Sequence, residues 1–152
     1  MTHEFQILED AVITALTPLK ASLGVKTLEP MQDLSTVDDL NALARRTPAI
    51  FVAADDLTSQ VHNRDDIISL AVNILVCDRG ARYEAASRGA TGVGPGVYVL
   101  LGAIKNALHE KRLIAGWRPL SRVREGALDV DPAKGLAIFA AQYETGLVER
   151  RF

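Results

Sequence analysis

The stretch at residues 67–80, IISLAVNILVCDRG, decides the fold of this chain. Apolar side chains occupy alternate positions, at Ile68, Leu70, Val72, Ile74 and Val76. Such alternation predicts a β-strand over residues 67–78 with five apolar side chains on one face. The other face mixes small, polar and apolar residues. We therefore expect a long strand with one face in the hydrophobic core.

Length and composition limit the classes of protein to consider. The 152 residues match the usual size of one domain, and no repeat or linker divides them, so a single domain over residues 1–152 is expected. A net charge of −2 lacks the basic excess of a free-standing nucleic-acid-binding protein. The one cysteine, Cys77, excludes an internal disulfide and fits a reducing cytoplasm. Neither a signal peptide nor a membrane span is predicted.

An amphipathic helix is predicted over residues 3–23. Its apolar stripe comprises Ile7, Ala11, Ala15 and Leu19, and it is widened by Val12, Leu16 and Leu23. Pro18 removes a backbone hydrogen bond, so the helix either kinks near Thr17 or restarts with Pro18 in its first turn. Gly24 is expected to end it.

Three shorter elements precede the long strand. Residues 25–29 read as a strand, and a helix over residues 35–46 begins at a capping arrangement of Ser or Thr with Asp. Residues 49–54, AIFVAA, are apolar at every position. A strand that is apolar on both faces is covered on both sides, so we place this strand centrally in the sheet.

The polar segment at residues 55–66 joins this strand to the long one. Asn63 is available for a turn, so the two strands are predicted to form a β-hairpin. The tip, at residues 57–64, is expected to project beyond the sheet and to be the better candidate for function.

Beyond the long strand the sequence returns to helix. A short helix is predicted at residues 83–87, followed by a glycine cluster at residues 89–96 and a helix over residues 97–111. Basic side chains in the last turn of that helix complement its dipole.

A second hairpin is predicted at the end of the chain. Residues 121–130 and 136–145 both alternate, and the proline and glycine of residues 131–135 are typical of a turn. The tail at residues 147–152 is predicted to be frayed or bound by a partner. The expected fold is α+β, a mainly antiparallel sheet with the first and last long helices packed on one face.

The glycine cluster could in principle cradle a phosphate before a helix. It includes Gly89, Gly92, Gly94 and Gly96. The pattern lacks the lysine and hydroxyl of a P-loop and does not follow a strand tightly as a dinucleotide-binding motif does. A loop with a tight turn into a helix is the simpler interpretation, so no cofactor is predicted.

The first predicted hairpin carries side chains that could bind a metal. Its candidate ligands are Asp55, Asp56, His62, Asp65 and Asp66. These oxygen and nitrogen ligands suit a divalent cation. With Arg64 beside them, a charge-balanced loop in solvent is the simpler interpretation, and no metal is predicted.

No catalytic group is predicted. The three histidines, His3, His62 and His109, lack the spacing of a zinc site. Cys77 ends a strand, and no nucleophile elbow occurs, so Cys77 is interpreted as a small strand residue.

Arginines gather in two places. Arg79, Arg82 and Arg88 follow the long strand, and Arg118, Arg122 and Arg124 lie near the start of the penultimate one. They are either a solvated face or an interface or positively charged lumen. Trp117 is interpreted as a partly buried anchor that a partner could also use.

Four stretches carry a family resemblance over almost the whole chain. They are ILEDAVITAL at residues 7–16, RRTPAIFVAA at 45–54, GVYVLLGAIKNAL at 96–108 and FAAQYET at 139–145. With the order of elements, they resemble the tail terminator proteins of tailed bacteriophages, and are most similar to the Mu-like branch of contractile tails and prophages.

The resemblance implies a homohexameric ring that caps the tail tube, stops its polymerisation and presents a surface to the head. It implies no enzyme activity and no cofactor. The implied partners are copies of itself, the tail tube and sheath proteins, and a head connector or neck protein, with DNA only as passing cargo and no membrane. Assembly would occur in the host bacterial cytoplasm, and the product would reside in a virion tail or tail-like particle.

The candidates for contact with a neighbouring subunit or the tube are Asp56, Leu57, His62, Arg64, Asp65, Arg79, Arg82, Trp117, Arg122, Arg124, Arg150 and Arg151. Two other functions stay open. One is another neck or head-completion protein, and the other is a small ligand-binding domain that uses residues 89–96.

Overall fold

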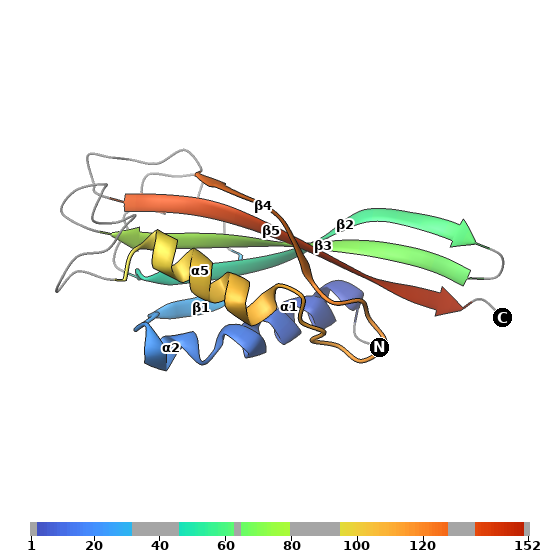
Figure 1. Ribbon diagram of the computed structural model, residues 1–152, viewed down its shortest axis with the longest axis horizontal. Coiled ribbons are helices and arrows are strands. Elements are labelled where there is room, and N and C mark those ends of the chain that lie inside the picture. Colours follow the sequence, from blue (N-terminus) through green and yellow to red (C-terminus); the bar gives the residue numbers. More distant parts are fainter. Residues whose placement is uncertain (1–2, 32–45, 63–64, 80–94, 128–135, 151–152) are drawn as a thin grey trace.

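The computed structural model describes residues 3–31, 46–62, 65–79, 95–127 and 136–150. Its elements are α1 (Glu4–Leu16), α2 (Leu19–Ser22), β1 (Thr27–Pro30), β2 (Ala49–His62), β3 (Asp65–Arg79), α5 (Val97–Leu108), β4 (Ser121–Ala127) and β5 (Leu136–Arg150). The strands form one sheet in the order β1-β2-β3-β5-β4. Only the β1–β2 pair is parallel. Figure 1 shows α1 and α5 on the same side of this long, twisted sheet. The predicted α+β class is confirmed.

The predicted long strand is β3, which lies at the centre of the sheet. Its alternating apolar residues Leu70, Val72, Ile74 and Val76 are buried in the main core with residues of α1 and α5. The opposite face carries a second buried cluster of Ala49, Phe51, Leu75, Cys77, Leu136 and Ile138. β2 is also buried on both faces, as predicted, but it lies one place away from the centre. The central position goes to β3, because β3 pairs with both β2 and β5 along its length.

The first helix restarts at the proline, which was one of the two predicted outcomes. α1 ends at Leu16, and Pro18 is the N-cap of α2. Gly24 follows with φ +68°, a left-handed conformation that glycine adopts without strain. The predicted apolar stripe is confirmed in part. Val12 and Leu16, which were predicted to widen it, are fully buried together with Leu8, whereas Ile7, Ala11 and Ala15 are only half-buried.

β2 is longer than predicted. It continues to His62, and its last residue lies opposite Asp65 in the ladder. The predicted antiparallel pairing of β2 and β3 is confirmed, but the prediction of a polar connection over residues 55–66 was wrong, because the strands continue to His62 and from Asp65. The register shifts between Asp56 and Thr58, which marks a β-bulge at Leu57. Alternation was not visible here because a strand outside the core needs no apolar face.

β5 is also longer than predicted. Its end, Leu147 to Arg150, pairs with β3 from Ile68 to Asp65, so the prediction of a frayed tail was wrong for these residues. The last long helix ends at Leu108, and β4 is described to Ala127. Residues 35–45 of one predicted helix, the predicted helix at 83–87, the turn at 131–135 and Arg88 lie outside the described residues. Arg46, the last residue of the first of these helices, is described and lies in a turn.

These corrections define two parts of the sheet. We call residues 58–62 of β2, 65–69 of β3 and 146–150 of β5 the arm, and the rest of the described chain the body. In the arm, each strand pairs with its neighbour from one end to the other. Ile68 and Leu147, at the base of the arm, are partly buried against the main core. Figure 1 shows the far ends of these three strands running past the helices.

Candidate interaction surface

A β-bulge in β4 separates the arginines that the sequence grouped together. Arg122 lies opposite Tyr143, and Arg124 lies opposite Gln142, with a register shift between them. Consecutive residues of β5 point to opposite faces of the sheet. Arg122 is therefore on the helix-covered face and Arg124 on the other, although a regular strand would put both on one face.

Arg122 is held on the helix side of β4. Its backbone N–H donates to Nδ1 of His109 at 3.1 Å, and its Nη1 lies 3.3 Å from Oε1 of Glu125. Tyr143, opposite Arg122, is fully buried, and its hydroxyl has no hydrogen-bond partner among the described residues. Burial, reinforced by the Glu125 charge and opposed by that of Arg122, raises the pKa of Tyr143 to about 12.

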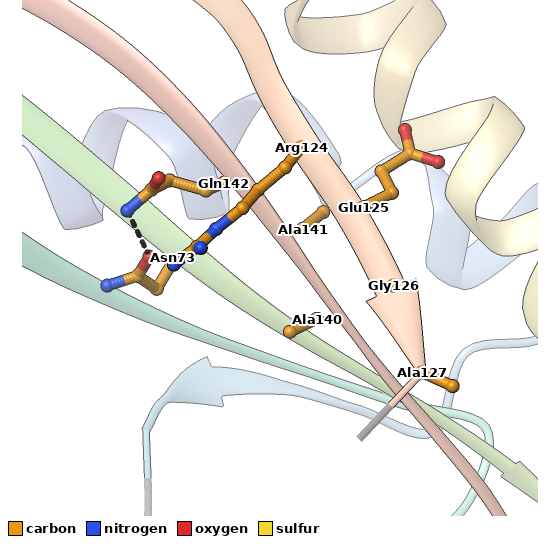
Figure 2. Close-up of a pocket in the computed structure, with 8 residues that line it drawn as sticks. All are labelled: Asn73, Arg124, Glu125, Gly126, Ala127, Ala140, Ala141 and Gln142. Carbon is orange, nitrogen blue, oxygen red and sulfur yellow. Dashed lines mark hydrogen bonds between the residues drawn. The ribbon is translucent and has the colours of Figure 1, made fainter.

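Arg124 lines a surface pocket on the opposite face, shown in Figure 2. The pocket has a volume of about 320 Å³ and is lined by Asn73, Arg124, Glu125, Gly126, Ala127, Ala140, Ala141 and Gln142. Nε2 of Gln142 donates to Oδ1 of Asn73 at 3.1 Å, which links β5 to β3. Arg124 makes no ion pair within the described part of the chain. A guanidinium beside two amides can receive a carboxylate or phosphate.

Arg118 crosses the base of the arm. Its backbone N–H donates to the Gly146 carbonyl at 2.8 Å, and its Nη2 donates to Oγ of Ser69 at 3.3 Å. The Thr145 hydroxyl donates to the Arg118 carbonyl at 2.6 Å. A Cβ at Gly146 would come within 2.8 Å of the Ile68 carbonyl oxygen and closer still to the Arg118 guanidinium. Gly146 was not predicted as a site residue, although a glycine inside a strand often marks such a close approach.

The first turn of α5 meets a carboxylate of the protein itself. Asp78 is 2% exposed, and its carboxylate accepts hydrogen bonds from the N–H of Arg79 at 2.7 Å and of Gly96 at 2.8 Å. Burial raises the pKa of Asp78, and these two hydrogen bonds oppose the rise. Of the four glycines considered as a phosphate cradle in the sequence, only Gly96 is described, and its N–H already donates to Asp78. Burial also raises the pKa of the adjacent Cys77 thiol, which disfavours a nucleophilic thiolate.

The candidate metal ligands are spread along a ladder. Asp55 lies opposite Ala71, whereas His62 lies opposite Asp65 at the far end of the arm. At about 3.3 Å per residue, Asp55 and His62 are roughly 23 Å apart along β2. No group of three or more potential ligands capable of holding a metal occurs among the residues that the structure describes. None of the helices found there is long and apolar enough to cross a membrane.

The remaining contact candidates divide between the arm and the body. Leu57 is at the bulge, Asp56 lies opposite Leu70, and Arg150 lies opposite Asp65. Arg79 is exposed at the end of β3, and Trp117 is partly buried against the main core, as expected for an anchor. Arg64, Arg82 and Arg151 lie outside the described residues.

Comparison with known proteins agrees with the predicted resemblance to Mu-like phage proteins. No curated protein matches the sequence. A chain of a structure titled "Virion of native gene transfer agent (GTA) particle" has a similar fold, with a TM-score of 0.64 at 15% sequence identity. That similarity covers 97% of this chain and 99% of the other. Residues 5–147 match the family model described as "Bacteriophage Mu, Gp37". The chain therefore belongs to the bacteriophage Mu Gp37 family, a family of phage structural proteins.

Proposed function

We propose that this protein forms a ring that caps the phage tail tube, terminates tail polymerisation and provides the surface to which the head or its connector joins. The role needs no chemical reaction and no cofactor. Membership of a phage structural family over residues 5–147, together with a virion protein of similar fold, supports this proposal. The ring consists of copies of this chain, six in the family resemblance, and its partners are the tail tube, the sheath and a neck or connector protein.

The observation that carries the ring is the difference in charge between the two sides of the sheet. Arg122 and Arg124 are exposed on β4, at one edge. Asp55 is exposed on β2, and Asp10 is exposed on α1, which packs against β1 and β2 toward the other edge of the sheet. A closed ring requires two different, complementary patches on each subunit, because its contacts are heterologous. Opposite charges at the two sides provide that complementarity.

Imaging of tails assembled without this protein tests the proposed function. Overlong tubes are expected, because nothing would stop addition of tube subunits. Restoring the protein during assembly should return the tubes to one length. Tubes of normal length that lack heads would contradict termination.

Such normal-length tubes without heads would favour the alternative of a neck or head-completion protein, which joins the head to the tail but does not set the length of the tube. The ligand-binding alternative is weakened by Asp78, whose carboxylate already accepts the Gly96 N–H at the start of α5. A thermal-shift measurement with nucleotides tests it, and no shift is expected.

A further inference from the structure

The sheet edges of the body are closed by residues of the same chain. β1 pairs with β2 from Ala49 to Val52, and the N–H of Met31 donates to the Val52 carbonyl at 2.9 Å. Beyond that point, the N–H of Ala54 donates to Oε2 of Glu9 at 3.5 Å. This edge of β2 is therefore covered as far as Ala54.

The other edge of the body is closed in a similar way. β4 pairs with β5, and its own outer side is protected by His109, which accepts the Arg122 N–H. β4 also carries a bulge and three charged residues, which are devices that keep an edge strand from pairing. The Gly146 carbonyl, where β5 leaves the body, accepts from the backbone of Arg118.

In the arm, the outer edges of β2 and β5 are open within the part of the chain that the structure describes. The outer edges of residues 58–62 of β2 and 147–150 of β5 have no strand partner or side-chain cap among the described residues. The β2 segment, TSQVH, contains no proline and no Asp, Glu, Lys or Arg. The segment therefore lacks the charges and the proline that commonly protect an exposed edge strand, and the bulge at Leu57 lies before it. An unpaired edge of this kind is a template for another strand.

We propose that the arm joins copies of this chain by edge-to-edge strand pairing, with the β5 edge of one copy added to the β2 edge of the next. This inference rests on the proposed ring and identifies the contact that builds it. The two open edges lie at the same level of the sheet, since β3 pairs with both over residues 65–69. β2 and β5 both run antiparallel to β3, so the new pair is parallel.

A second copy fits this surface better than a strand from an unrelated partner. A single foreign strand would satisfy one edge and leave the other open. Head-to-tail addition of identical arms satisfies both edges of every copy once the ring closes. β4 is the alternative partner edge, but the Arg122 N–H on its outer side already donates to His109, which disfavours pairing there.

Cysteine cross-linking tests the pairing with tubes present and an added copper oxidant that accepts the two electrons. Ser59→Cys is combined in turn with Leu147→Cys, Val148→Cys or Glu149→Cys, so that each parallel register is sampled. Within one copy β3 separates β2 from β5, which places them roughly 9.6 Å apart. A disulfide needs Cα atoms closer than about 7 Å, so any bond formed joins two copies. The native Cys77 is fully buried and unsuited to reaction.

At least one pair is expected to give a ladder of covalent multimers on a non-reducing gel that collapses with reductant. The matched control, Ser59→Cys with Val123→Cys on β4, is expected to give none. Rings of unmodified protein without a ladder from any arm pair would overturn the edge pairing and leave the ring standing. Monomers alone on tail tubes would overturn both the pairing and the proposed function.

Proline substitution gives a second test, which does not depend on the oxidation of introduced cysteines. Backbone N–H groups alternate between the two edges of a strand, so Ser59→Pro and Gln60→Pro affect different edges of β2. One variant should lower the melting temperature by breaking the β2–β3 ladder. The other should melt like the unmodified protein yet lose the ring. Rings of normal mass from both variants would contradict the proposal.

Discussion

In the body, β2, β3 and β5 are buried on both faces, and their outer edges are closed by β1, β4 and side chains of the same subunit. In the arm, the same three strands continue with their hydrogen-bonded ladder intact but without these edge partners among the described residues. Burial of apolar area stabilises the first region, and backbone pairing holds the second. A single sheet can therefore supply both a self-contained fold and an open contact surface.

The largest expected effect compares one substitution at two positions of β3. Ile74 is fully buried in the body, whereas Ile68, on the same face, is only partly buried at the base of the arm. Ile74→Ala should lower the free energy of unfolding by about 2–5 kcal/mol, through lost burial and a residual cavity. Ile68→Ala should cost less. Urea unfolding followed by circular dichroism measures both, and equal losses would remove the distinction between the regions.

Alkaline pH should destabilise the body, because Tyr143 is buried there and its ionisation is disfavoured in the folded state. Its pKa is raised from 10.0 to about 12. Because the folded value is above the unfolded one, stability is present below pH 10 and is lost as the pH rises from 10 to 12. At about 1.4 kcal/mol per unit, this loss is on the order of 3 kcal/mol.

Tyr143→Phe cannot ionise and should not show this loss. The difference in free energy of unfolding between the two proteins, followed from neutral pH through that window, measures it. Below pH 10 the variant should be at least as stable, since the buried hydroxyl lacks a partner among the described residues. If the difference in free energy of unfolding stayed constant at every pH, the phenol group of Tyr143 would have to be exposed to solvent.

The junction of body and arm should respond to Gly146→Ala. The added methyl group meets the Ile68 carbonyl oxygen and the Arg118 guanidinium, so a loss of about 1–3 kcal/mol is expected from overpacking. Adding Arg118→Ala should relieve only the clash with the guanidinium, because the Ile68 backbone stays in place.

Gly102→Ala is the matched control, since a Cβ there has no neighbour within 4 Å. In the middle of α5 it should raise stability by about 1 kcal/mol through helix propensity. Thermal melts of the three variants measure these effects. A gain at Gly146 equal to that at Gly102 would mean that neither the Arg118 guanidinium nor the Ile68 carbonyl lies close to Gly146 in solution.

The smallest expected effects concern the two arginines that the bulge separates. Arg122→Ala breaks an exposed ion pair with Glu125 and should cost about 0–1 kcal/mol. Arg124→Ala should change monomer stability by less than about 0.5 kcal/mol, since Arg124 has no ion pair in the described residues. Chemical denaturation of the monomers measures both. A larger loss at Arg124 would indicate a structural role on its face of the sheet.

The elements in contact with the core could be predicted from the sequence. The alternation of β3 and the restart at Pro18 are periodic or steric signals that depend on nearby residues only. The arm could not be predicted in full, because residues 58–62 and 146–150 pair through backbone groups, which every sequence carries. The polar composition at these positions is typical of a loop or a chain terminus and does not predict a strand.

The arrangement of the candidate surface residues could not be predicted from the sequence either. Arg122 and Arg124 are two apart in sequence, and only the shift of β4 against β5 at Val123 places them on opposite faces. The role of Gly146 depends on Arg118, which lies far away in the chain. A single sequence carries no direct signal for a register shift or a contact between distant segments.

The sequence by itself determined the α+β class, the long strand β3 and the two helices that pack on one face of the sheet, because apolar periodicity follows from the geometry of each element and the need to bury its apolar face. Only the tertiary structure decided how far β2, β3 and β5 extend, which edges are closed and which face each arginine takes. These properties depend on the pairing of backbone groups between strands that are remote in sequence, and pairing is set by the assembled sheet.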